Sequence, residues 1–210
     1  MNENKQVHVF RFIKDLPNIC SLLGLLSAVI GIYYAILGNF PAAIIGVLWA
    51  VLFDWYDGII ARRMKGRTKV QGDFGSQFDS MIDIVSFGIL PAIFLLSYAE
   101  YNIWFLPGAF IIIAVSAIRL TYFNVYGLID SKTYKGFPLD NNVLILALVF
   151  LLESFFTITT FSIILYTLMM LLSALNLSSI RTPKFSGKWV YVLVSYVLVM
   201  TSFFGWLLWR

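Results

Sequence analysis

The stretch "FDWYDGIIARRMKGRTKVQGDFGSQFDSMIDIVSFGILPA" (residues 53–92) contains five aspartates and lies between long apolar segments. Four of them are Asp54, Asp57, Asp79 and Asp83, and the chain is 60% hydrophobic and only 12% charged. An ordinary soluble domain has about 25% charged residues. The composition therefore predicts an integral membrane protein, in which ionised carboxylates are energetically unfavourable and need an explanation.

Along the chain, continuous apolar runs are long enough to be membrane helices, which need about 20 mostly apolar residues. Seven such spans are expected, and that of residues 139–154 is the shortest: 18–38, 41–64, 75–98, 102–125, 139–154, 157–180 and 187–209. We predict an all-α fold, a polytopic transmembrane helix bundle of about seven spans, with six or eight as alternatives. Residues 1–210 are expected to form a single domain.

Lys and Arg residues indicate the orientation of the bundle. They cluster before the first span and after the second, fourth and sixth, whereas the opposite loops near residues 38, 98–102 and 153–157 contain none. Such residues concentrate in short cytoplasmic loops. We therefore expect residues 1–16 to be a cytoplasmic juxtamembrane segment, and the protein to lie in the plasma membrane with its active site on the cytoplasmic side.

The net charge of +4 fits the same picture. A basic membrane face attracts anionic lipid headgroups and phosphorylated substrates, so membrane lipids are expected partners and no nucleic acid is needed to explain the charge. The single cysteine, Cys20, lies in an apolar run and is predicted to be a small buried hydrophobe. The single histidine, His8, is expected at the surface.

The spacing of the aspartates predicts two acidic stripes. Asp54 and Asp57 are three residues apart and Ala61 follows four later, so all three share one face of a helix. Gly75, Asp79 and Asp83 repeat every four residues on the next span. The two stripes can face each other across the intervening loop. Each ionised carboxylate at membrane depth costs about 2.5 to 3.5 kcal/mol, so the group requires compensation.

A divalent metal is the compensation that we favour. Clustered carboxylates repel one another unless they are protonated or bridged by a cation, and hard oxygen ligands suit Mg²⁺ or Mn²⁺. Gly58 and Gly75 leave room for a ligand to approach the backbone. The alternatives are an ion-pair network with neighbouring cations, or an ion-translocation path.

The pattern Asp54-x-x-Asp57-Gly58-x-x-Ala61-Arg62, followed by Gly75-x-x-x-Asp79-x-x-x-Asp83, resembles the signature of the CDP-alcohol phosphotransferases, integral membrane enzymes of phospholipid synthesis. The gap between Arg62 and Gly75 is several residues longer than is usual in that family. The resemblance implies that Asp54, Asp57 and Asp79 ligate one or more divalent metals, with Asp83 as a further ligand or the general base. It also implies a CDP-lipid site formed by Asp54, Gly58, Ala61, Arg62 and Gly75.

Further segments are similar to the phosphatidylserine synthase branch of that family: "LPNICS" (16–21), "FDSMIDIVSFGILPA" (78–92), "AIRLTYFNV" (117–125) and "SSIRTPKF" (178–185). The stretch "KGFPLDNN" (135–142) matches the branch's Gly-Leu-Pro-x-Pro turn only in part, because it lacks the second proline. The resemblance implies the reaction of CDP-diacylglycerol with L-serine to give phosphatidylserine and CMP, and it implies a homodimer.

Two residues outside the signature are candidates for substrate binding. Asn18 could hydrogen-bond the nucleotide, or it could cap a helix at the membrane interface. Arg119 lies inside a predicted span, where an arginine is a functional candidate by default. Its guanidinium could bind the carboxylate of serine bidentately, or it could pair with a motif aspartate.

Three other functions remain open from the sequence. The acceptor could be inositol phosphate or glycerol phosphate, although such acceptors should require several convergent basic residues, and the helix interiors offer chiefly Arg119. The donor could be ether-linked CDP-archaeol, with serine still the acceptor. A cation transporter that uses the aspartates as a pathway is the alternative outside enzymology.

Overall fold

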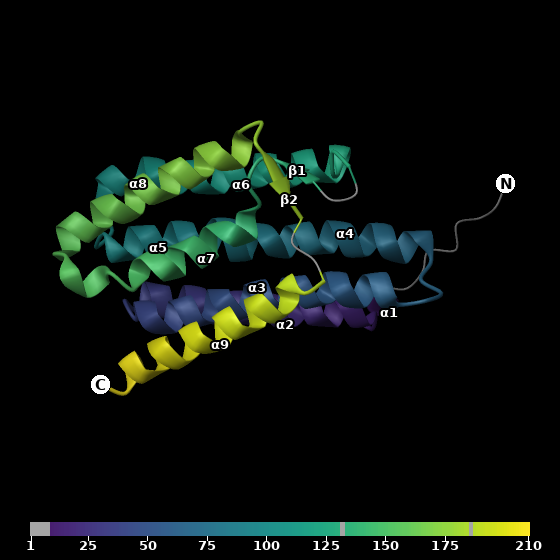
Figure 1. The fold of residues 1–210 in the computed structure, drawn as a ribbon, viewed down its shortest axis with the longest axis horizontal. Helices are drawn as coiled ribbons and strands as arrows, with labels where there is room; N and C mark the ends of the chain where they lie inside the picture. The colour runs from purple at the N-terminus through teal and green to yellow at the C-terminus, as the bar shows by residue number, and fades with distance from the viewer. Residues whose placement is uncertain (1–8, 131–132, 185–186) are drawn as a thin grey trace.

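The fold is a bundle of long helices that run back and forth along one direction (Figure 1). The structure is a computed structural model, and it describes residues 9–130, 133–184 and 187–210. The helices are α1 (Phe10–Ile13), α2 (Leu16–Ile36), α3 (Phe40–Arg63), α4 (Lys69–Asp83), the π-helix η1 (Ile84–Ile89), α5 (Leu90–Tyr98), the 3-10 helix η2 (Ile103–Phe105), α6 (Leu106–Tyr126), α7 (Leu139–Phe150), the 3-10 helix η3 (Glu153–Phe155), α8 (Ile158–Leu177) and α9 (Trp189–Leu208).

Within the described residues, six helical segments are long and apolar enough to cross a membrane. They are Leu16–Ile36, Phe40–Arg63, the continuous Lys69–Tyr98, Ile103–Tyr126, Ile158–Leu177 and Trp189–Leu208. The predicted all-α, polytopic membrane fold is therefore confirmed.

The expected span at residues 139–154 is shorter than predicted. Its helix, α7, has 12 residues, because Pro138 precedes it and the chain enters a 3-10 turn at Glu153. At 1.5 Å per residue it is about 18 Å long, whereas the hydrocarbon core of a bilayer is about 30 Å thick. In Figure 1 α7 nevertheless runs opposite to α6 and α8, so the direction of the chain alternates as expected.

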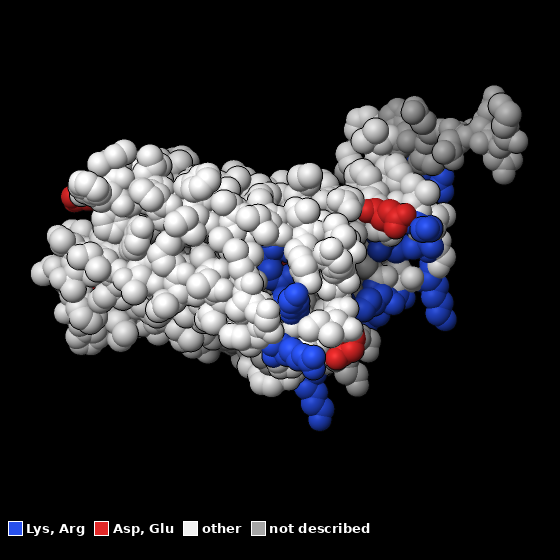
Figure 2. All heavy atoms as spheres, turned by 90° about the horizontal axis from the view of Figure 1, so that it is seen from above, with Lys and Arg blue, Asp and Glu red and all other residues white. Residues whose placement is uncertain are grey.

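The connections after α3, α6 and α8 lie at the end of the bundle where the described chain begins (Figure 1). Two of them pair as a small antiparallel sheet, in which Tyr134 of β1 (Thr133–Lys135) is opposite Thr182 of β2 (Arg181–Pro183). Figure 2 shows Lys and Arg side chains gathered toward this end, while most of the visible face carries no charge. We call it the basic end.

Aromatic side chains pack the opposite end of the bundle. The ring centroid of Phe40 lies 4.8 Å from that of Tyr98, and the ring centroids of Phe94 and Phe150 are 5.4 Å apart. The Tyr98 hydroxyl donates a hydrogen bond of 3.1 Å to Glu153. Phe94, Tyr98 and Phe150 are buried, so these contacts join α3, α5 and α7 in an aromatic core.

The helices α2 and α3 approach each other closely through glycine. A Cβ added at Gly46 would lie 2.7 Å from the Cα of Gly31, and one at Gly31 would lie 3.1 Å from the carbonyl oxygen of Ala43. Small residues permit such backbone contact between membrane helices. Beside this interface Cys20 is buried, as predicted, with its Sγ 3.3 Å from the carbonyl oxygen of Phe53. His8 lies outside the described residues.

The α2–α3 contact yields a test of the packing. Gly46→Val should lower the free energy of unfolding by at least about 2 kcal/mol, because the new side chain meets backbone that cannot move aside. Gly205→Val is the matched control, since in the described part of the chain a Cβ at Gly205 meets no atom within 4 Å. Thermal unfolding midpoints in detergent would measure both. Equal midpoints for the two variants would contradict this account of the packing.

Candidate active site

The loop between α3 and α4 sets the register of the two acidic helices. Thr68 caps α4, accepting a hydrogen bond from the backbone N–H of Gln71, while the Gln71 side chain accepts one from the backbone of Thr68. Arg67 in the same loop forms an ion pair of 2.8 Å with Asp15, ahead of α2. Helix α4 therefore begins at a fixed point, which determines the positions of its aspartates.

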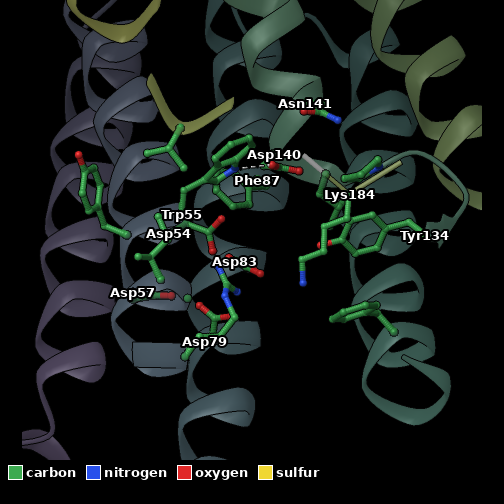
Figure 3. Close-up of a pocket in the computed structure, with 18 of the residues that line it drawn as sticks. Asp54, Trp55, Asp57, Asp79, Asp83, Phe87, Tyr134, Asp140, Asn141 and Lys184 are labelled. Carbon is green, nitrogen blue, oxygen red and sulfur yellow. Dashed lines mark hydrogen bonds between the residues drawn. The ribbon is translucent and has the colours of Figure 1, made fainter. Parts of the chain in front are cut away.

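The acidic stripes of α3 and α4 face each other, as their spacing predicts. Oxygen atoms of Asp54, Asp57 and Asp79 all lie within 4.8 Å of one another. Asp57 is buried and accepts a hydrogen bond from the hydroxyl of Ser21 on α2. Asp83 lies one turn beyond Asp79, and Figure 3 shows its carboxylate beside those of the other three.

A π-helical segment comes directly after Asp83. In η1 the backbone is wider than in an α-helix, a feature that is frequent at functional sites. Gly88 within it lies against α6, since a Cβ there would be 3.0 Å from the Cβ of Ser116. Arg119 is one turn beyond Ser116 on α6. The close contact at Gly88 therefore brings Arg119 toward the aspartates.

The aspartates form one wall of a cavity of about 650 Å³ at the basic end. Side chains from α6 and from the β1–β2 sheet form the opposite wall, and the start of α7 lines the cavity between the two, with Asp140 beside Trp55 (Figure 3). The opposite wall includes Arg119, Tyr134 and Lys184. An anionic wall thus faces a wall that contains two cations.

Arg119 is buried at this cavity, with 6% of its surface exposed. Its Nε has no hydrogen-bond partner among the described residues. A buried guanidinium N–H without a partner is energetically unfavourable, and a carboxylate ligand would satisfy it. The structure thus gives no support to the alternative in which Arg119 pairs with a motif aspartate.

The two polar residues from the sheet region have perturbed pKa values. Burial, together with the carboxylates of Asp140 and Asp54, raises the pKa of Tyr134 to about 12, so its hydroxyl stays protonated and can donate a hydrogen bond. Burial, and then the nearby Arg62, lowers the pKa of Lys184. An anion bound between Arg62 and Lys184 would relieve that repulsion.

The remaining predicted site residues divide into two groups. Gly58 and Arg62 line the cavity, whereas its lining does not include Asn18, Ala61 or Gly75. Asn18 donates a hydrogen bond of 2.8 Å to the carbonyl oxygen of Phe12 at the end of α1, so it does not cap the start of α2. A Cβ at Gly75 would lie 2.9 Å from the guanidinium of Arg67 and 3.2 Å from Oδ1 of Asn18. Gly75 thus leaves room for the Arg67–Asp15 ion pair.

The structure also brings in residues that the sequence did not indicate as part of the site: Trp55, Tyr134, Asp140, Asn141 and Lys184. Asp140 had one available signal, because it stands at the place of the missing proline in "KGFPLDNN". Tyr134 and Lys184 come from loops, and no spacing rule connects them to the aspartates.

The aspartate group fits a divalent metal. Oxygens on opposite sides of one Mg²⁺ are about 4.2 Å apart, because each lies about 2.1 Å from the ion. The observed spread of up to 4.8 Å therefore requires only a small movement for Asp54, Asp57 and Asp79 to share an ion. The ligands are all hard carboxylate oxygens, which Mg²⁺ and Mn²⁺ prefer.

Comparison with known proteins agrees with this geometry. The CDP-alcohol phosphatidyltransferase family model matches residues 14–209. The archaetidylserine synthase of Methanothermobacter thermautotrophicus is 35% identical over 174 residues, 82% of this chain and 71% of that protein. The CDP-diacylglycerol–serine O-phosphatidyltransferases of Methanocaldococcus jannaschii and Helicobacter pylori strain 26695 are each 29% identical, covering 86% and 89% of this chain and 81% and 79% of their own lengths.

A family match over nearly the whole chain excludes the transporter alternative. The chain belongs to the CDP-alcohol phosphatidyltransferase family, and it is a membrane-embedded enzyme of that family.

Proposed function

We propose that the protein transfers the phosphatidyl group of CDP-diacylglycerol to L-serine and releases CMP, in phospholipid biosynthesis. The observation that carries the proposal is the cavity lined by the motif aspartates and by the buried Arg119, whose Nε has no hydrogen-bond partner among the described residues. The relatives named as serine transferases support serine as the acceptor. The similarity to an archaetidylserine synthase supports a second donor, the ether-linked CDP-archaeol, for the same transfer.

In this proposal Asp54, Asp57 and Asp79 hold Mg²⁺ or Mn²⁺, and Asp83 is either a further ligand or the base. A divalent ion bound there would neutralise the diphosphate and make the phosphorus under attack more electrophilic. Asp83 lies one turn beyond Asp79, on the cavity side, where it can accept the proton of the serine hydroxyl. The serine oxygen then bonds to the phosphorus of the phosphatidyl group while the bond from that phosphorus to the CMP oxygen breaks.

The basic residues of the cavity orient the donor. Arg62 on α3 and Lys184 after β2 both line the cavity, and they can bind phosphate oxygens from two sides. Gly58 gives room to Arg62, since a Cβ there would lie 3.3 Å from its guanidinium. Val190 and Tyr191 of α9 line the cavity and are apolar or aromatic. Tyr191 is 75% exposed on the outer surface of the bundle, so acyl chains can leave the cavity along α9.

The proposed CDP-lipid site also includes three residues that do not line the cavity and would act by positioning its helices: Asn18, Ala61 and Gly75. Gly75 lies against Asn18 and Arg67, and these residues hold the start of α4 next to α2. A substitution at Gly75 is thus expected to displace Asp79 rather than to remove a direct substrate contact.

We also propose that the basic end faces the cytoplasm in the plasma membrane, and that the enzyme is a homodimer. Lys and Arg gather at this end in the sequence and in Figure 2, as the positive-inside rule requires of a cytoplasmic face. The homodimer rests on family resemblance alone.

An acceptor screen with purified protein tests the proposed reaction. CMP release from CDP-diacylglycerol should require both L-serine and a divalent metal, and CDP-archaeol should be compared as donor in parallel. Inositol phosphate and glycerol phosphate should give little CMP, since in this proposal Arg62 and Lys184 bind the donor phosphates, which leaves Arg119 and the carboxylate Asp140 for the acceptor. CMP release only with a phosphorylated alcohol would show that serine is the wrong acceptor.

Removal of a single metal ligand should abolish turnover. Asp57→Asn or Asp79→Asn is expected to lower kcat by at least about 100-fold, because electrostatic stabilisation of the transition state is lost. Asp73→Asn is the matched control, since Asp73 lies on the same helix as Asp79 but is exposed and does not line the cavity. CMP release measured across a range of Mg²⁺ and Mn²⁺ concentrations checks this. Near-normal activity of Asp57→Asn at saturating metal would rule out its role as a ligand.

Substitution of Arg119 should change the KM for serine more than the KM for CDP-diacylglycerol. Arg119→Ala is expected to raise the KM for serine about 10- to 100-fold, the range for a lost charged hydrogen bond, and to leave the KM for CDP-diacylglycerol within a few-fold. Arg119→Lys should fall between, because an ammonium keeps the charge but not the bidentate geometry. Steady-state kinetics with each substrate varied in turn would show this. An equal loss for both substrates would indicate a structural role.

A further inference from the structure

Asp140 is a carboxylate of the cavity that is not one of the three converging motif aspartates. It lies in the first turn of α7 and lines the cavity beside Trp55, close enough to Asp54 and Asp83 for their charges to interact (Figure 3). Among the described residues, the group whose oxygens converge within 4.8 Å consists of Asp54, Asp57 and Asp79, and Asp140 is outside it. The proposed metal site therefore does not account for Asp140.

The position of Asp140 is fixed by contacts of the start of α7 with α3 and α8. The indole N–H of Trp55 on α3 donates a hydrogen bond of 2.8 Å to its Oδ2. Asn142, half a turn later, pairs with Asn176 of α8 through a bond of 2.8 Å. The preceding turn requires glycine, because Gly136 has φ +79° and a Cβ there would lie 2.3 Å from the carbonyl oxygen of Asn176. Asp140 is thus held in place before any substrate binds.

Burial disfavours the charge of Asp140, while the hydrogen bonds from Trp55 and from backbone N–H groups oppose that effect. Asp140 lies at the N-terminus of α7, where backbone N–H groups face its carboxylate and the helix dipole favours an anion. Arg119 is close enough for the two charges to interact, yet Arg119 and Asp140, both of which the structure describes, form no ion pair within 4.0 Å. Arg119 Nε is instead left without a hydrogen-bond partner among the described residues.

A fixed anion and a nearby cation whose Nε lacks a partner among the described residues match a ligand that carries both charges. An α-amino acid has its ammonium and its carboxylate on one carbon, so both groups can be bound at once only by such a pair. A phosphorylated alcohol has no cation for Asp140 and would be repelled by it. The site is thus suited to accept one ligand class and to reject the other.

We propose that Asp140 binds the ammonium group of the acceptor amino acid, while Arg119 binds its carboxylate, and that this pair selects an α-amino acid as the acceptor. The inference rests on the proposed serine transfer and deepens it, because it assigns selectivity for the amino group to a residue outside the family signature. Trp55 is the positioning residue, which holds one oxygen of Asp140 and leaves the other for the ligand.

The test compares two inhibitors that differ only in the amino group. L-alanine and propionate both lack the hydroxyl that reacts, and propionate also lacks the ammonium. In the wild-type enzyme L-alanine should compete with serine far better than propionate does. In Asp140→Asn the inhibition constant of L-alanine should rise about 10- to 100-fold, while that of propionate stays within a few-fold. Trp55→Phe, which keeps the carboxylate but frees it to move, should give a smaller rise for L-alanine.

Three results would overturn the inference. Equal weakening of both inhibitors in Asp140→Asn would indicate a structural role, and weakened Mn²⁺ binding by that variant would indicate a metal ligand. An unchanged ratio of the two inhibition constants, in an enzyme that uses serine, would show that Asp140 does not contact the ammonium. Failure of the proposed function is distinct, since the wild-type enzyme would then release no CMP in response to serine. Asp140→Ser provides the same comparison if the asparagine variant does not fold.

Discussion

Repulsion among carboxylates inside a membrane protein is the constraint on which the rest of this structure depends. Asp54, Asp57 and Asp79 lie within 4.8 Å of one another, and Asp57 is buried. Like charges at such distances repel far more strongly in a low-dielectric interior than in water. Packing of the helices must hold these carboxylates together, and a bound divalent cation would compensate their repulsion. Three interactions hold α3 and α4 in place despite this repulsion: the hydrogen bond from Ser21, the Thr68–Gln71 cap and the Arg67–Asp15 ion pair.

The two ends of the bundle differ in structure, since one is a packed aromatic core and the other contains the cavity. The end formed by Phe40, Phe94, Tyr98 and Phe150 is packed with aromatic rings, and the backbones of α2 and α3 are in close contact through glycine. The basic end carries the loops, the small sheet and the cavity. The π-helix after Asp83 joins the two parts, since it ends the acidic stripe and admits α6 to close contact at Gly88. The motif aspartates are thus carried by packed helices, whereas the connections between helices contribute Tyr134 and Lys184 to the cavity wall.

Features that depend on spacing and charge could be predicted from the sequence, whereas features that depend on tertiary contacts could not. Periodicity placed the aspartates on facing stripes, and Lys and Arg indicated which loops share an end. The apolar run at residues 139–154 looked like a span, but only residues 139–150 form the helix, because Pro138 and the turn at Glu153 bound it. Tyr134 and Lys184 enter the site through pairing of β1 with β2, which no local pattern encodes. Asn18 and Gly75 are close to each other, and Gly75 is also close to Arg67. They therefore pack next to the acidic helices and do not line the cavity.

The central claim, that a divalent metal bridges the motif aspartates, is tested most directly by locating the ion. Crystals grown with Mn²⁺ should show an anomalous scattering peak in contact with Asp54, Asp57 and Asp79 in the wild-type protein, and a loss of that peak in Asp79→Asn. An active wild-type enzyme with no peak among these carboxylates, or with its ion bound elsewhere, would contradict the account.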